Sequence, residues 1–127
     1  MLSLVALTPS VSGCEMVKSA YVSQVGGAAE ELAAVATTLR LVHEGRVTRQ
    51  YAQSTFANYR EVLVSFEPKL RKAEGAPAPD SVVRAVSVSR GVAQVIESPC
   101  LDDGCDWRGQ LAALETAAAA LDEEVGG

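Results

Sequence analysis

Apolar side chains recur at alternating steps of four and three along most of this chain, a spacing that places them on one face of an α-helix. The first stripe predicts a helix from Glu15 to about Glu44. Its apolar or small members are Val17, Tyr21, Val25, Ala28, Leu32, Val35, Leu39 and Val42. Gly26-Gly27 would allow a kink or a close helix contact, and Gly45 is well placed to end the helix in a left-handed conformation.

A second stripe begins near Thr48 and predicts another long helix. Its members are Ala52, Phe56, Tyr59, Leu63, Phe66 and Leu70. The aromatic side chains in this stripe indicate core packing rather than a cofactor site. Pro68 should kink or restart the helix, because proline lacks an N–H and its ring clashes with the preceding turn. The segment from Glu74 to Pro79 is then a break long enough to reverse the chain direction.

Residues 82–98 fit two patterns. The run Val86-Ser87-Val88-Ser89 alternates as a strand would. A helical face also fits, made by Val82, Ala85, Val88 or Ser89, Val92 and Ile96. We expect a helix, capped by Asp80 or Ser81, because the chain offers no second strand to pair with this one.

The most regular stripe closes the chain. Asp106 is expected to cap this last helix by accepting backbone N–H bonds. Its apolar positions are Trp107, Leu111, Leu114, Ala118, Leu121 and Val125. Four amphipathic helices joined by short connections predict an all-α fold, an antiparallel four-helix bundle with two longer N-terminal and two shorter C-terminal helices.

The length of 127 residues suits one domain, which we expect to span residues 14–127 behind a candidate signal peptide at residues 1–13. In the alternative arrangement, a helical hairpin completes its core by oligomerising.

Residues 1–13 are uncharged and largely apolar, as in the centre of a secretory signal peptide, and Pro9 is followed by small residues that suit a cleavage region. The segment Val11-Ser12-Gly13-Cys14 resembles the lipobox of bacterial lipoproteins, which consists of an aliphatic residue, a small residue, Gly or Ala, and an obligatory Cys. The resemblance covers the leader alone. It implies diacylglycerol transfer to the Cys14 thiol, cleavage after Gly13, and attachment to a membrane through Cys14.

The leader departs from the lipoprotein pattern in one respect. Residues 1–13 contain no Lys or Arg, whereas the start of a signal peptide carries positive charge that a start upstream of Met1 would supply. In the alternative interpretation, the apolar leader packs on the domain and Cys14 is a small core side chain. The apolar run from Leu2 to Leu7 is far shorter than the roughly 20 residues that span a bilayer.

Cys100 and Cys105 bracket a short acidic turn between the third and fourth predicted helices. Pro99 should stop one helix, and Gly104 should support the turn. Two cysteines across so tight a reversal can approach the Cα separation of about 5.5 Å that a disulfide prefers. We therefore predict a disulfide, which is typical of an oxidising compartment such as the periplasm. The four intervening residues differ from the spacing of a CxxC redox pair.

The chain shows no pattern of catalytic or metal-binding residues. It has no nucleophile elbow, phosphate-binding glycine loop or HExxH helix. The single histidine, His43, is expected to be a surface residue that complements the dipole of the first helix. Zinc needs about four ligands, and the acidic residues of the turn, Asp102, Asp103 and Asp106, lack the spacing of a calcium loop. We expect neither an enzyme nor a metal or cofactor site.

The net charge of −5 arises from 16 acidic and 11 basic residues without a Lys/Arg cluster, which argues against nucleic-acid binding. The leading hypothesis is a small exported lipoprotein, anchored through Cys14 in the bacterial envelope, whose bundle stands in the periplasm or at the outer membrane and binds another envelope protein. A phage-encoded envelope lipoprotein fits the same pattern.

The rival hypothesis is a helical subunit of an intracellular or virion assembly. It would keep its apolar N-terminus and its reduced cysteines, and Gly26-Gly27 and the Ala-rich stripes would make contacts between subunits. A homo-oligomer is compatible with both hypotheses.

Overall fold

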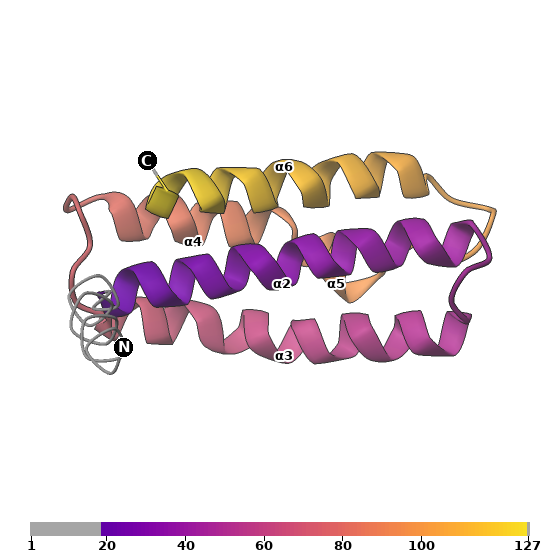
Figure 1. Ribbon diagram of the computed structural model, residues 1–127, viewed down its shortest axis with the longest axis horizontal. Coiled ribbons are helices and arrows are strands. Elements are labelled where there is room, and N and C mark those ends of the chain that lie inside the picture. Colours follow the sequence, from indigo (N-terminus) through magenta and orange to yellow (C-terminus); the bar gives the residue numbers. More distant parts are fainter. Residues whose placement is uncertain (1–18, 127) are drawn as a thin grey trace, which may run out of the picture.

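The computed structural model describes residues 19–126, which form an all-helical bundle. The helices lie side by side along the long axis of the molecule (Figure 1). Their bounds are α2 Ala20–His43, α3 Arg49–Lys72, α4 Ser81–Gly91, α5 Ala93–Glu97 and α6 Trp107–Gly126. The prediction of an all-α fold is confirmed, and the first two helices are longer than those that follow.

Local sequence signals set the helix ends. The Ser19 hydroxyl accepts a hydrogen bond from the N–H of Val22 at 3.1 Å, and Thr48 does the same for Tyr51 at 3.0 Å. At the other end of α2, Gly45 has a φ of 74°, the left-handed conformation predicted for it. The starts of α2 and α3 are therefore set by hydrogen-bonding cap side chains, and the connection between them is set by one glycine.

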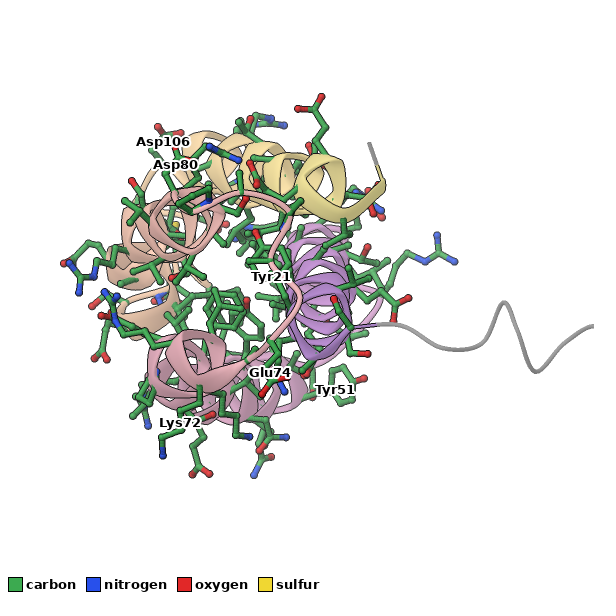
Figure 2. All side chains as sticks on the ribbon, turned by 90° about the vertical axis from the view of Figure 1, so that its left-hand side faces the viewer. Tyr21, Tyr51, Lys72, Glu74, Asp80 and Asp106 are labelled. Carbon is green, nitrogen blue, oxygen red and sulfur yellow. A yellow bond between two sulfur atoms is a disulfide. The ribbon has the colours of Figure 1, made fainter. Side chains whose placement is uncertain are left out.

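The core is made of the predicted apolar stripes, which surround a common interior when the bundle is viewed along its axis (Figure 2). The largest fully buried side chains are Tyr21, Phe56, Leu32, Leu39, Leu70, Ile96, Leu114 and Leu121. α2 packs most extensively against α6, and both helices bury small residues, such as Ala29 of α2 and Ala117 of α6. Burial of this apolar surface is the main contribution to the stability of the fold.

The choice of helix over strand for residues 82–98 is confirmed, with one interruption that was not predicted. α4 ends at Gly91, and a turn at Val92 separates it from α5. Glycine and a β-branched residue are weak helix formers, and the buried Val92 side chain fixes the turn in the core. On either side of the break, α4 packs on both α6 and α3, and α5 packs on α3.

Of the two outcomes expected at Pro68, a kink or a restart, the restart does not occur, since α3 continues through Pro68 to Lys72. The carbonyl that loses its N–H partner belongs to Val64, whose side chain is 73% exposed, so this part of the helix faces water. Phe66 and Leu70 on either side are buried and hold the last turns against the core. Within the described residues, no helix is long and apolar enough to cross a bilayer.

Candidate functional site

The predicted anchor, Cys14, lies outside the described residues. The nearest described residue on its side is Ser19, the N-cap of α2. This end of the bundle also holds the connection between α3 and α4 (Figure 1), and the N–H of Tyr21 donates to the carbonyl of Glu74 at 3.0 Å.

The opposite end of the bundle carries the cysteine turn. The Sγ atoms of Cys100 and Cys105 lie 2.06 Å apart, and the Cα atoms 5.8 Å apart. Cys100 is buried at 3% exposure, whereas Cys105 is exposed. The turn therefore presents one sulfur to solvent and the other to the core.

Side chains from three elements brace this turn. His43 Nε2 lies 2.6 Å from the Cys100 carbonyl, and the imidazole stacks on Trp107 with ring centroids 4.3 Å apart. Gln110 Oε1 accepts a hydrogen bond from the Cys100 N–H at 2.7 Å, and Arg49 forms an ion pair with Asp102. His43 lies in the last turn of α2, as expected for a residue that complements the helix dipole, but it is half-buried rather than on the surface, and its contacts fasten α2 to the turn.

The acidic turn residues do not gather around a common point. Asp102 pairs with Arg49, and Asp106 Oδ1 accepts a hydrogen bond from the Gly109 N–H at 2.9 Å, as predicted for the cap of the last helix. Across residues 19–126, no group of three or more His, Cys, Asp or Glu side chains is arranged to hold a metal ion.

A polar group is embedded in the core near the N-terminal end of the bundle (Figure 2). The hydroxyl of Tyr21 lies 3.2 Å from the carbonyl of Ser81 and 3.4 Å from a carboxylate oxygen of Glu124. Burial raises the pKa of this hydroxyl, and the Glu124 carboxylate adds to the effect. Arg84 binds the same carboxylate at 3.0 Å, so the contacts join α2, α4 and α6 structurally.

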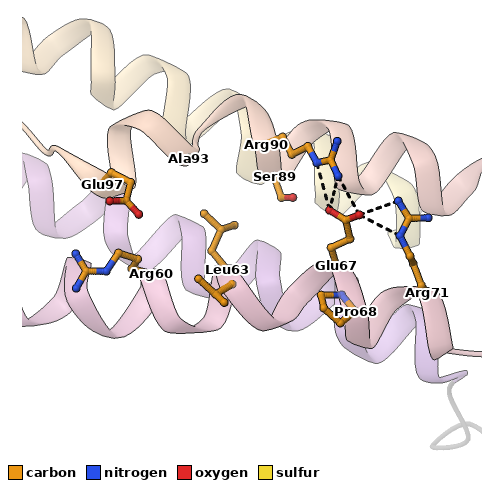
Figure 3. A pocket seen from close by; sticks show the side chains of 10 residues that line it. Arg60, Leu63, Glu67, Pro68, Arg71, Ser89, Arg90, Ala93 and Glu97 are labelled. Atoms are coloured by element: carbon orange, nitrogen blue, oxygen red, sulfur yellow. Dashed lines mark hydrogen bonds and ion pairs between the residues drawn. The ribbon is translucent and has the colours of Figure 1, made fainter.

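Among the described residues, a groove with a volume of about 580 Å³ lies between α3 and the α4–α5 segment (Figure 3). Leu63, Val64, Pro68 and Ala93 supply its apolar lining. One end carries a cluster in which Arg71 and Arg90 both bind the carboxylate of Glu67, with shortest distances of 2.8 and 2.7 Å. These hydrogen bonds, first those from Arg71 and then those from Arg90, lower the pKa of Glu67.

The groove was not predicted from the sequence. The four-residue spacing of Glu67 and Arg71 is visible there as a helical ion pair. Arg90, however, belongs to another helix, and only the packing of α4 on α3 brings it to the same carboxylate.

The comparisons with known proteins give no family assignment. The chain matches no protein-family model, no curated protein and no solved structure. Its function therefore has to be argued from its own residues.

Proposed function

We propose that this protein is a small exported lipoprotein of the bacterial envelope, anchored through a lipid on Cys14, whose helical body is a non-catalytic binding module for another envelope component. The observation that carries the proposal is the segment Val11-Ser12-Gly13-Cys14, placed behind an apolar leader and five residues before the N-cap Ser19. Lipidation at that position would place the modified residue directly beside the folded body. The anchored protein would face the periplasm or lie at the outer membrane.

The cysteine turn supports the same proposal. We propose that Cys100 and Cys105 are joined as a disulfide in the cell, because their Cα separation of 5.8 Å suits the bond. An exposed sulfur such as that of Cys105 is accessible to cellular reductants, so a lasting bridge indicates an oxidising compartment. The bridge would hold the turn next to His43 and Trp107.

The body is proposed to be an antiparallel four-helix bundle in which α4 and α5 together take the third position. Support comes from the packing of α2 against both α3 and α6, and of the α4–α5 segment against α3. A non-catalytic role is proposed because the polar groups of the largest described groove are already engaged: the Ser89 hydroxyl donates to the Val86 carbonyl, and the Glu67 carboxylate accepts hydrogen bonds from Arg71 and Arg90.

The test is the intact mass of the full-length protein produced in a bacterium with its export machinery. The proposal expects loss of residues 1–13 and an added acyl mass on Cys14, with the protein in the membrane fraction. The matched variant Cys14→Ser should lack the acyl mass and leave that fraction. An unmodified wild-type chain that still starts at Met1 would refute lipidation.

A second candidate is the helical subunit of an intracellular or virion assembly. It is favoured by a second groove of about 420 Å³ between α4 and α6, which is lined by small uncharged residues, among them Gly91, Ala113 and Ala120. Such a surface suits close contact with a helix of a neighbouring subunit. This candidate expects the unmodified mass together with a concentration-dependent oligomer in sedimentation experiments.

A further inference from the structure

We propose that the groove between α3 and the α4–α5 segment binds an aliphatic carboxylate, with the anionic group at Arg71 and Arg90 and the hydrocarbon chain along the apolar lining. This inference rests on the binding-module part of the proposed function. It concerns the ligand, and it is independent of whether Cys14 is lipidated.

One end of the groove is positively charged because it holds two arginines and one glutamate. Two guanidiniums share the single carboxylate of Glu67, which leaves one positive charge in excess. Glu67 is only 29% exposed, whereas the side chains of Arg71 and Arg90 are 53% and 68% exposed. The two arginines therefore turn much of their surface to solvent and can receive a second anion.

The other end of the groove is balanced. Figure 3 places Arg60 of α3 and Glu97 of α5 there, one of each sign. The surroundings strengthen this difference between the ends, because the last turn of α3, beside the Glu67 cluster, carries the basic residues Lys69, Arg71 and Lys72. An anionic group should consequently settle at the Arg71 end.

The apolar part of the ligand is indicated by the lining. Leu63, Val64, Pro68 and Ala93 are all aliphatic, and no aromatic side chain lines this groove. Val64 is 73% exposed, the largest value among the exposed large hydrophobic residues of the described chain. From Leu63 to Arg71 the helix rises about 12 Å, which is room for a chain of medium length. A ligand there would cover Val64 and gain hydrophobic stabilisation.

The size of the groove favours a small ligand over a protein. A stable protein interface uses about 20 to 30 residues on each side, whereas ten residues line this groove. Its volume of about 580 Å³ lies within the range of roughly 300 to 1,000 Å³ that is typical of small-molecule sites. The groove between α4 and α6 has no charged lining residue and so gives no indication of a ligand.

The test is titration calorimetry of decanoate into the full chain carrying Cys14→Ser, which cannot be lipidated. We expect saturable binding of one decanoate with a Kd below about 1 mM. Decyltrimethylammonium has the same chain length and the opposite charge, and it should not bind. Arg90→Gln removes the excess positive charge and should weaken decanoate binding about tenfold. Arg46→Gln changes an exposed arginine outside the groove and should leave binding unchanged.

A second matched pair tests the hydrocarbon part of the site. Val64→Ser should weaken decanoate binding, whereas Val83→Ser, at a 60% exposed valine outside the groove, should not. Circular dichroism of each variant confirms that the helices are retained. Undetectable decanoate binding, equal binding of the cationic amphiphile, or an unchanged Kd in Arg90→Gln would overturn the proposal. So would a dimer of the unliganded chain that Val64→Ser dissociates, because the groove would then hold a second copy.

The two proposals can fail separately. The calorimetry uses a chain that is never lipidated, so a failure to bind decanoate says nothing about the mass of the wild-type protein. An unmodified wild-type mass would in turn leave the Kd values of the groove variants as they are.

Discussion

Removal of the exposed sulfur of the cysteine turn gives the sharpest test of how this end of the bundle is stabilised. The perturbation is Cys105→Ser, made in the full chain with Cys14→Ser, so that Cys100 is the last thiol. Cys105 is exposed, and its replacement costs no core packing, whereas Cys100 is buried and remains in place. The effect of the variant is therefore the effect of the bridge.

The magnitude follows from the length of the loop that the bridge closes. Cys100 and Cys105 are separated by 5 positions in the sequence. The entropy that so short a closed loop removes from the unfolded chain corresponds to about 2 kcal/mol at 25 °C. For a domain of this size, such a loss should lower the Tm by about 6 to 10 °C.

The assay is thermal unfolding followed by far-UV circular dichroism, with and without reductant. The Cys14→Ser background should lose the full Tm difference when reductant is added, and Cys105→Ser should show the lower Tm in both conditions. Either of two results would contradict this prediction. One is that reductant leaves the Tm of the Cys14→Ser background unchanged, and the other is that reductant lowers the Tm of the Cys105→Ser variant.

Two tyrosines give further predictions. Tyr21→Phe removes the hydroxyl next to the buried Ser81 carbonyl and should lower the free energy of unfolding, measured by denaturant titration, by about 1 to 2 kcal/mol. The control Tyr51→Phe changes a residue that is 57% exposed and should alter the free energy of unfolding by less than about 0.5 kcal/mol. Equal effects of the two substitutions would contradict this prediction. Burial, with a contribution from Glu31, raises the pKa of Tyr59 to about 12. Tyrosinate absorbance should therefore show an ionisation at high pH that Tyr59→Phe removes. Because the unfolded chain releases this proton at a lower pH than the folded chain, the contribution of Tyr59 to the free energy of unfolding should be complete below pH 10 and should fall as the pH rises from about 10 to 12.

The helices could be predicted from the sequence because their signals are local. The stripe of α3, its cap Thr48 and the left-handed Gly45 all act within one or two turns. The break at Val92 escaped prediction because the same residues also fit one continuous helical face, whereas in the structure α4 packs on both α6 and α3 and α5 packs on α3. The helix does not restart at Pro68, because Phe66 and Leu70 on either side are buried and outweigh one lost hydrogen bond.

The contacts that define the candidate sites depend on distant parts of the chain. His43 reaches the carbonyl of Cys100 across 57 positions, and Arg90 reaches Glu67 across 23. Charge and spacing within one helix predict Glu67 with Arg71, but nothing local says that a third charged residue joins them. Pairings of this kind arise from tertiary packing, so they cannot be predicted from the local pattern of a single sequence.

The proposed anchor would set the orientation of the proposed groove relative to the membrane. Cys14 precedes Ser19 by five residues, which can span at most about 18 Å, so a lipid there would hold the start of α2 close to the bilayer. The end of α3 meets the start of α2 through the Tyr21 to Glu74 hydrogen bond, so Arg71 lies at the end of the bundle where α2 begins, which is the end that the proposed anchor would hold. The 24 residues of α2 rise about 36 Å, which places the cysteine turn on the far side. An aliphatic carboxylate leaving the membrane would then meet the arginine end of the groove before any other part of it.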